Sequence, residues 1–586
     1  MFIFLTFSRA DLYTVTNTQN SGAGSLRQTI NDANTHTGPD TIFFDISDTD
    51  PGYDASQGVW IIQPEEPLPI IQDDSTMIKA ETQTKNQGDQ NPDGPEIMLY
   101  GKLIDESVSA FTINSAYNII SGMVISGFSE SGIFISGDNA HHNQITRNYI
   151  GTNVSGSDTL GNGCGIFVVV GSSHNIIGGE GENDFNIISG NHNSGIFISY
   201  SDSNLVIGNR IGTDVTGTFS LGNRKNGVYI ASYCTGNIIG GSTAEKRNII
   251  SGNMQSGIYV YGRQIRNNYI QGNYIGVDIN GTSKLGNNLG ILLGWEVSKI
   301  IIGGLESGQG NVISGNQSLG IKIYREEADS NQVLGNFIGT GADGKSNLGN
   351  GGKGIELIDG TQKNKIGPSN VIRFNDGSGI TVWGNTTLYN RITQNSISDN
   401  ESNGILLIHG GNGELASPVI TSLNSVSGTA PPNSTVEIFS DSLDQGMIYE
   451  ATVTADGSGN FFWSGTPVGP NVTATATDED GNTSEFSDAI TVTAVKTADK
   501  HIPEQYFLAQ NYPNPFNPET TIQFGVKKPC QVVLTVYNLL GKEVEKLVDE
   551  HYQPGQYEIS FNVKEYTSGI YVYKIKMGSF QAMRKM

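Results

Sequence analysis

The sequence predicts an all-β protein whose main part is a right-handed parallel β-helix, and three observations support this prediction. Glycine accounts for 75 of 586 residues, about 13% of the chain, against about 7% in ordinary proteins. Short motifs recur at a fixed spacing along the middle of the chain. Within these repeats, no segment places apolar residues every three to four positions, as a helix of ten or more residues would. The chain is therefore rich in turns and strands.

Internal repeats give the period of the β-helix. An Ile-Gly-Thr/Val string starts at positions 150, 211, 275 and 338, at steps of 61, 64 and 63. A shorter motif, Gly, then Ile or Val, any residue and an apolar residue, occurs twice as often. Each long repeat therefore contains two coils of about 31 residues, and each coil reads as three short strands between Gly, Asn and Ser turns. We expect about 11 or more coils, each adding about 4.8 Å of rise.

The period-two alternation of strands assigns the residues of each motif to the inside or the outside of the coil. The residues expected to stack inside are Ile133, Ile196, Ile258 and Ile321, followed by Ile135, Ile198, Val260 and Ile323. An asparagine also recurs in the turns, at Asn191, Asn253 and Asn316. Identical amides on successive coils can hydrogen-bond to one another, so we expect a ladder of asparagine side chains.

The flanking segments predict a cap and two further modules. In residues 24–34 (GSLRQTINDAN), Ser25 is a suitable N-cap, and Leu26, Ile30 and Ala33 share one helical face. Two small β-sandwiches are expected after the β-helix, because alternating runs and Pro or Gly turns continue to the end of the chain. The expected divisions are 1–10 (signal-peptide remnant), 11–117 (cap and first coils), 118–414 (parallel β-helix), 415–494 (Ig-like sandwich), 495–505 (linker) and 506–586 (C-terminal sandwich).

Four of these segments resemble known families. The helix at 24–34 resembles the N-terminal capping motif of β-helices, and the repeats resemble the parallel β-helix repeat (PbH1) of bacterial surface proteins and polysaccharide lyases. Residues 417–494 resemble a bacterial Ig-like module. Residues 506–586, with NYPNPFNP at 511–518, resemble the sorting domain of type IX secretion cargo. This last resemblance implies the type IX secretion machinery as a partner and a secreted location, extracellular or on the outer surface of a Gram-negative bacterium.

Charge and hydropathy exclude two classes of function. The formal net charge is −24 and no segment is strongly basic, which argues against nucleic-acid binding. No apolar run reaches the ~18–20 residues of a membrane-spanning helix, so an integral helical membrane protein is not expected. Residues 1–10 are apolar as far as Phe7 and end in Ser-Arg-Ala, which suits either the end of a signal peptide or a first strand.

A row of aromatic residues is expected on the outer face of the β-helix. In each motif, the residue between the two inward positions points outward, and five successive coils place an aromatic ring there. Sugar rings stack on such surfaces, so the row predicts a platform for extracellular polysaccharide; alternatively, the rings pack on one another or under the loops. The predicted binding residues are Phe134, Phe167, Phe197, Tyr229 and Tyr259, with Tyr261, Tyr324 and Trp383 in a second row and Arg263 beside them.

The densest charged cluster lies where the aromatic row ends, and it suggests an enzyme as the alternative function. In a polysaccharide lyase, Lys322 or Arg325 could act as the base while Arg263 held the uronate carboxylate. In a glycoside hydrolase, Glu356 would need a second carboxyl group about 5–9.5 Å away, which Asp359 or Glu327 could supply. A solvated edge without chemistry is the third interpretation.

No metal or cofactor follows from the spacing of His and Cys residues. Loops at 213–226 and 277–289 place Asp214 and Asp278 at equivalent positions, but Asn153 and Gly341 occupy that position elsewhere. A calcium loop in every repeat is therefore not expected, although one or two isolated calcium sites fit the pattern. The leading hypothesis is an exported surface β-helix protein that binds polysaccharide; the alternatives are a polysaccharide lyase or glycoside hydrolase and a non-catalytic structural spacer or adhesin.

Overall fold

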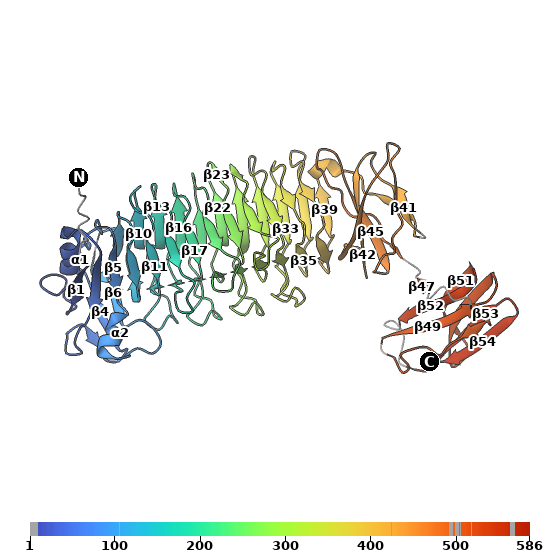
Figure 1. The fold of residues 1–586 in the computed structure, drawn as a ribbon, viewed down its shortest axis with the longest axis horizontal. Helices are drawn as coiled ribbons and strands as arrows, with labels where there is room; N and C mark the ends of the chain where they lie inside the picture. Colours follow the sequence, from blue (N-terminus) through green and yellow to red (C-terminus); the bar gives the residue numbers. More distant parts are fainter. Residues whose placement is uncertain are drawn as a thin grey trace, which may run out of the picture. The chain divides into compact units, whose positions relative to one another are not determined.

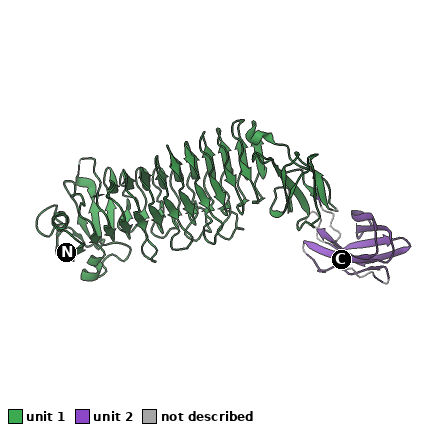
Figure 2. Cartoon of the chain, turned by 45° about the horizontal axis from the view of Figure 1, so that its top comes forward, with its two compact units in different colours: residues 1–490 green, residues 491–586 purple. Residues whose placement is uncertain are grey.

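The chain divides into two compact units, residues 1–490 and 491–586 (Figure 2). The computed structural model describes residues 10–104, 106–423, 425–491, 496–497, 503, 505–516, 518–562 and 569–586. Residues 1–9 of the predicted signal-peptide remnant and most of the predicted linker over 495–505 lie outside the described residues. The first unit contains the β-helix and a small antiparallel module, and the second contains the C-terminal sandwich.

Three long sheets wind along the first unit (Figure 1), and they confirm the predicted parallel β-helix. Sheet A comprises β1 (Asp11–Val15), β2 (Asp40–Phe44), β5 (Thr76–Lys79), β8 (Ile119–Ser121), β11 (Gln144–Thr146), β14 (Ile176–Gly178), β17 (Leu205–Ile207), β20 (Ile238–Gly240), β24 (Tyr269–Gln271), β28 (Ile301–Gly303), β31 (Gln332–Leu334), β34 (Lys365–Ile366) and β37 (Arg391–Ile392). Sheet B comprises β3 (Tyr53–Asp54), β4 (Val59–Ile62), β6 (Ile97–Tyr100), β9 (Met123–Ser126), β12 (Tyr149–Ile150), β15 (Ile187–Ile188), β18 (Arg210–Ile211), β21 (Ile249–Ile250), β25 (Tyr274–Ile275), β29 (Val312–Ile313), β32 (Phe337–Ile338), β35 (Val371–Arg373) and β38 (Ser396–Ser398). Sheet C comprises β7 (Phe111–Ile113), β10 (Ser131–Ser136), β13 (Cys164–Val169), β16 (Ile196–Ser199), β19 (Val228–Ile230), β22 (Ser256–Tyr261), β26 (Leu289–Gly294), β30 (Ile321–Tyr324), β33 (Ile355–Ile358), β36 (Ile380–Trp383) and β39 (Ile405–Ile408).

From β7 onward, successive coils contribute strands to all three sheets, and the repeat motif falls on sheet C. Parallel pairing brings Phe134 opposite Phe167 and Phe167 opposite Phe197, so equivalent residues of successive coils lie in register. The inward isoleucines and valines named from the sequence are all 0% exposed. Burial of these columns along the whole stack supplies the core of the β-helix.

Asparagine side chains close the turns, as predicted, and they form more than the one ladder that the sequence indicated. The predicted asparagines belong to a column that continues through the next coils: Asn162, Asn191, Asn223, Asn253, Asn287, Asn316, Asn350, Asn375 and Asn400. Each amide nitrogen in this column donates to the amide oxygen of the next member. These amides are buried and hydrogen-bonded on both sides, so they satisfy backbone groups that the sharp turns leave unpaired.

The Ile-Gly-Thr/Val string has a steric explanation. Gly151 has a φ of +93°, and a Cβ atom at this position would lie 2.4 Å from the carbonyl oxygen of Ser189 on the next coil. Only glycine combines this backbone conformation with such a close approach. The recurring glycine therefore marks the point where one coil turns beneath the next.

A helix covers the N-terminal end of the stack, as the sequence predicted. Helix α1 spans Leu26–Thr35, and the Ser25 hydroxyl accepts a hydrogen bond from the Gln28 amide. The apolar face of α1 is buried against the first coil. A second short helix, α2 (Thr82–Gln87), has no apolar periodicity and was not predicted.

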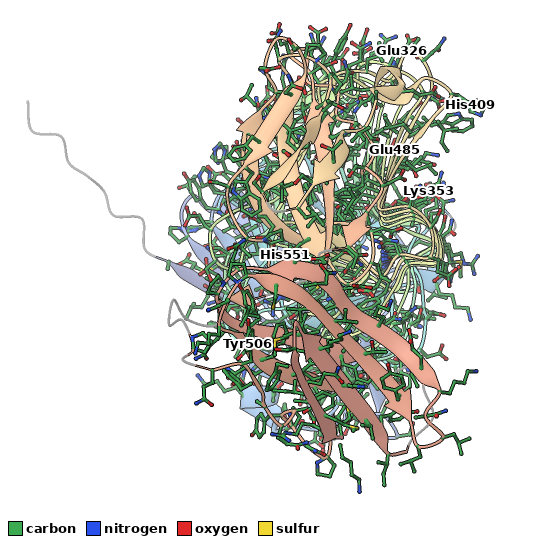
Figure 3. The ribbon with its side chains drawn as sticks, turned by 90° about the vertical axis from the view of Figure 1, so that its right-hand side faces the viewer. Glu326, Lys353, His409, Glu485, Tyr506 and His551 are labelled. Atoms are coloured by element: carbon green, nitrogen blue, oxygen red, sulfur yellow. The ribbon has the colours of Figure 1, made fainter. Side chains whose placement is uncertain are left out.

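The antiparallel module after the last coil, here called the end module, comprises β40 (Val419–Ser422), β41 (Val426–Thr429), β42 (Thr435–Asp441), β43 (Ile448–Thr454), β44 (Asn460–Trp463), β45 (Asn471–Thr477) and β46 (Ile490–Thr491). Its side chains accept hydrogen bonds from the amides of the last coil. The Gln445 side chain takes the place of the next asparagine in the column. Its Oε1 accepts from the Asn400 backbone N–H at 3.0 Å and from the Asn400 side-chain nitrogen at 3.3 Å. Glu485, labelled in Figure 3, accepts from the Leu407 amide at 2.7 Å. The end module thus closes the C-terminal end of the stack.

Glu437 of the end module is 2% exposed and accepts hydrogen bonds from the Thr393 hydroxyl and the Gln394 amide. Burial raises the pKa of this carboxyl above its ordinary value of 4.5, although both hydrogen bonds oppose the shift. A carboxyl with a higher pKa in the folded state stabilises the fold most at low pH, and this contribution is lost as the pH rises through the folded-state pKa.

In Glu437→Gln, the amide oxygen can still accept from the Gln394 amide, while the new NH2 group can donate to the Thr393 hydroxyl oxygen. We therefore expect this variant to unfold at a higher denaturant concentration than the parent protein at pH 7 but not at pH 4. Glu437→Ala removes the acceptor and is expected to lose about 1–3 kcal/mol at both pH values. Chemical denaturation at the two pH values measures these effects. An unchanged pH dependence in Glu437→Gln would contradict the assignment.

The second unit is a sandwich of two four-stranded antiparallel sheets in the described residues. One sheet contains β47 (Lys496–Thr497), β48 (Phe507–Leu508), β49 (Glu519–Val526) and β52 (Gly555–Asn562). The other contains β50 (Cys530–Asn538), β51 (Glu543–Tyr552), β53 (Tyr571–Met577) and β54 (Phe580–Lys585). Phe524, Phe561 and Tyr573 are buried in its core. This architecture agrees with the small β-sandwich expected from the alternating pattern.

Candidate functional site

A groove of about 610 Å³ runs along the outer face of sheet C. Its floor consists of the five aromatic residues that the sequence placed on this face, supplied by β10, β13, β16, β19 and β22. Polar residues from the turns before these strands form its rim. The lining residues are Phe134, Cys164, Phe167, Val169, Asn193, Ser194, Phe197, Lys225, Asn226, Tyr229, Gln255 and Tyr259.

The five rings contact one another while remaining half-buried. Centroids of neighbouring rings lie 4.8–6.1 Å apart. The first four rings pack edge to face, with interplanar angles of 86–90°. Tyr229 and Tyr259 are tilted by 37°. The row is therefore both a packed column and the floor of a groove, because each ring supports its neighbours and leaves part of its surface to the groove.

The rim of the groove is polar, and its charge is positive. Among the described residues that line the groove, Lys225 is the only charged one. Lys225, Asn193 and Gln255 are exposed and can reach a ligand lying on the rings. A ring-lined floor with amide and ammonium groups along one side offers both apolar contact and hydrogen bonds.

The sequence analysis missed this rim, although a signal for it exists. Asn193, Lys225 and Gln255 each lie two positions before the glycine of the repeat motif. Because parallel coils stack in register, a fixed offset from the motif becomes a line along one edge of the sheet. The offset could have identified these residues, but their varied chemistry does not stand out in a single sequence.

A second aromatic group continues from the end of the groove. Tyr261 stacks on Tyr259 at 5.5 Å and on Tyr324 at 6.1 Å. Trp295, which the sequence analysis did not select, lies 5.9 Å from Tyr261. Gly294 permits this arrangement, because a Cβ atom there would lie 2.4 Å from the Tyr324 ring. Of the second predicted row, Tyr261 and Tyr324 thus stack next to Tyr259, the last ring of the floor.

Trp383, like Tyr261, Tyr324 and Arg263, is not among the residues that line the groove. It is 40% exposed, and its ring lies 5.8 Å from that of His409 near the C-terminal end of the β-helix. The column of Tyr259 continues with Leu292, Lys322 and Glu356 on the intervening strands and with Thr381 on β36 itself, so the aromatic floor ends at Tyr259. The predicted role of Trp383 in binding stays a prediction.

Glu356 lies at the centre of the charged cluster. This residue is 6% exposed, and its carboxylate lies 3.1 Å from Lys322 Nζ and also pairs with Lys353. Lys353, labelled in Figure 3, was not among the predicted site residues. Although burial raises the pKa of Glu356, the two lysines outweigh it and lower the pKa below its ordinary value. A carboxylate held in this way is a poor proton donor, and the paired Lys322 is less available as a base.

The two predicted arginines lie over aromatic rings. The Arg325 guanidinium carbon is 5.7 Å from the Tyr261 ring and 5.6 Å from the Tyr324 ring. Arg263 lies over Trp295 at 5.2 Å and approaches Glu296 at 4.0 Å. The structure therefore brings together Lys322 and Glu356, and it places Lys322 and Arg325 over the same Tyr324 ring. Arg263 lies apart, over Trp295.

The acidic residues of the long loops point to their own backbone. Asp214 accepts hydrogen bonds from the Thr216 hydroxyl and the Thr218 amide. Asp278 accepts from the Thr282 and Ser283 amides in the same manner. These bonds fix the loop shape. Within the described part of the chain, no three His, Cys, Asp or Glu side chains are placed to hold a metal ion together.

Comparison with solved structures finds β-helical proteins of low sequence identity. The A-module of the Azotobacter vinelandii mannuronan C-5 epimerase AlgE4 is 14% identical, with coverage of 68% of this chain and 94% of that one and a TM-score of 0.34. A mutant of the periplasmic alginate epimerase AlgG is 15% identical, with coverage of 64% and 74% and a TM-score of 0.31. The tailspike gp49 of Acinetobacter baumannii bacteriophage Fri1, a capsular polysaccharide depolymerase, is 10% identical, with coverage of 83% and 82% and a TM-score of 0.23.

Sequence comparison identifies the C-terminal unit. No curated protein shows significant similarity to the chain. None of the helices in the described residues has the length and hydrophobicity needed to cross a bilayer.

Residues 510–586 match the family described as "Secretion system C-terminal sorting domain", as NYPNPFNP predicted. The chain is therefore a secreted or cell-surface protein that joins a parallel β-helix to a secretion system C-terminal sorting domain.

Proposed function

We propose that the β-helix binds an extracellular polysaccharide along the groove on sheet C. The observation that carries this proposal is the 610 Å³ groove, with an aromatic floor and a polar rim. The apolar faces of sugar rings pack on aromatic side chains, while their hydroxyl groups need hydrogen-bonding partners along the edge. Asn193, Asn226 and Gln255 supply such partners. An extended ligand suits a groove whose lining spans five successive coils.

Binding without cleavage agrees better with the charged cluster than catalysis does. Glu356 is buried between two lysines and its pKa is lowered, so Glu356 is a poor general acid and both lysines are held in ion pairs with it. The type IX machinery of a Gram-negative bacterium would export the protein through residues 506–586, and the β-helix would hold polysaccharide outside the cell. In the structural-spacer alternative, the same exported protein binds no glycan.

The direct test replaces Phe197, Tyr229 and Tyr259 together by alanine. We expect about 10- to 100-fold weaker binding, which corresponds to about 1.4–2.8 kcal/mol, because the central part of the floor is lost. A polysaccharide array identifies a ligand, and calorimetry with that ligand compares the variant with the parent protein. The matched control is Phe219→Ala, which removes a ring that is 69% exposed on a long loop.

Three results would contradict the proposal. If the parent protein binds no polysaccharide, a spacer or adhesin is favoured. If the triple variant binds as tightly as the parent protein, the groove is not the binding site. Release of unsaturated uronate products, or of new reducing ends, identifies an enzyme instead. Circular dichroism of the variant separates loss of the groove from loss of the fold.

A further inference from the structure

The outward column of sheet B contains one charged residue in an otherwise apolar run. Successive strands place equivalent residues side by side, and the column reads Tyr149, Ile187, Arg210, Ile249, Tyr274, Val312 and Phe337. Arg210 on β18 thus stands where the neighbouring coils carry aliphatic or aromatic side chains. A charge at such a position removes apolar contact from the column, which calls for a compensating partner.

Arg210 lies beside a small cavity between the loops that connect sheet A to sheet B. The cavity has a volume of about 180 Å³. The Arg210 guanidinium carbon is 4.0 Å from the centroid of the Phe185 ring. The residues that line the cavity are Gly181, Glu182, Phe185, Gly208, Asn209, Arg210, Ala244, Glu245, Arg247, Ile249 and Ile279.

A second arginine in the cavity has a similar arrangement. Arg247 lies over the Tyr274 ring at 4.2 Å, and its Nε donates to the Gly272 carbonyl oxygen at 3.2 Å. Arg247 lies two residues before β21, the strand of sheet B that pairs with β18. Two adjacent coils therefore each hold a guanidinium group against an aromatic ring. This fixes the plane of each group and directs its remaining N–H groups along that plane.

Neither arginine forms an ion pair with a carboxylate in the described residues, although Asp214 acts on Arg210 and Glu245 on Arg247 through space. Within the same residues, the Arg210 guanidinium donates no hydrogen bond to the protein. Asp214, the acid nearest along the chain, is used by the hydrogen bonds of its own loop. Glu182 and Glu245 line the cavity but are exposed to solvent. Burial also lowers the pKa of the Arg210 guanidinium, which agrees with a cation that lacks full compensation.

We propose that this arginine cavity is a binding site for one oxyanion group, held between Arg210 and Arg247. The volume is below the roughly 300–1,000 Å³ of sites for drug-sized ligands, so the cavity suits a single charged group rather than a chain of sugars. Arginine recognises carboxylate, sulfate and phosphate oxygens through paired N–H donors. The anion is either a free inorganic ion or the acidic substituent of a saccharide. The site lies on sheet B, so it does not depend on the groove on sheet C.

The test is calorimetric titration of the full chain with three probes: inorganic phosphate, galacturonate and neutral galactose. We expect the parent protein to bind an anionic probe and not galactose. Arg210→Met keeps the apolar stem on the column and removes the charge, and we expect at least about tenfold weaker binding. Arg247→Met is expected to have the same direction of effect. Arg210→Lys, which keeps the charge without paired donors, should fall between the parent protein and Arg210→Met.

The matched control is Glu182→Gln, which removes a negative charge from the rim and should bind the anion equally well or more tightly. Tighter binding of galacturonate than phosphate identifies a saccharide as the source of the anion, and the reverse order identifies a free ion; both support the site. Binding of neither anion by the parent protein overturns the proposal. Affinity that is unchanged in Arg210→Met and Arg247→Met, with both variants folded, also overturns it.

Discussion

Replacing Asn253 by alanine is expected to lower the free energy of unfolding by about 3–5 kcal/mol. The Asn253 amide nitrogen donates to the carbonyl oxygen of Ile211 at 3.1 Å and to the side chain of Asn287 at 2.9 Å. Its oxygen accepts from the side-chain nitrogen of Asn223 at 2.9 Å. Asn253 is 1% exposed, so alanine would leave several buried polar groups without partners and without water.

Equilibrium denaturation, with hydrogen exchange resolved by coil, measures this effect. The control is Asn139→Ala, because Asn139 is exposed in a turn and such a change is expected to stay within about 0.5 kcal/mol. Exchange should increase most in the coils on either side of Asn253, since each coil contacts mainly its neighbours. A loss for Asn253→Ala no larger than that for Asn139→Ala would show that the amide column contributes little to stability.

A chain ending at residue 414, which lacks the end module, is expected to self-associate and to lose hydrogen-exchange protection in its last coil. Six backbone N–H groups of that region would lose their acceptors: those of Tyr389, Ile392, Gln394, Ile397, Asn400 and Leu407. The truncation also uncovers the edges of three sheets at once. Open edges of this kind pair with other chains.

Light scattering and hydrogen exchange of β37, β38 and β39 check this expectation. The control is a chain ending at residue 491, which keeps the end module and removes only the second unit. We expect this control to remain monomeric with full protection. A truncated chain that stays monomeric and equally protected at its last coil would show that the stack closes without the end module.

Most of the fold could be predicted from the sequence, because successive coils repeat the same pattern of inward and outward residues. The inward isoleucines at positions such as Ile196 and Ile258 recur with the motif glycine, so a single error of register would have been contradicted by every other coil. The capping helix was also predicted, because two independent signals indicate it: Ser25 is a suitable N-cap, and the residues after it form an apolar helical face. By contrast, the closing role of Glu437 and Gln445 was not predicted, since their partners lie about 45 residues away and no local pattern links them.

The candidate site was predicted in its composition but not in its geometry. Alternation placed Phe197 and Tyr229 on one face, yet their edge-to-face packing depends on rotamers that no spacing encodes. Lys225 and Trp295 were missed because each occurs once at its position in the repeat. The pairing of Glu356 with Lys353 also escaped prediction, although both residues belong to one short segment.

The replacement of an asparagine by Gln445 at the end of the column has a consequence for how such proteins change in length. Every coil presents an amide in the same place, so Gln445 would meet an equivalent partner whether one coil were added or removed before it. The terminal modules therefore need no redesign when a duplication lengthens the solenoid. Selection can therefore change the number of rings in the ligand-facing row by one coil at a time.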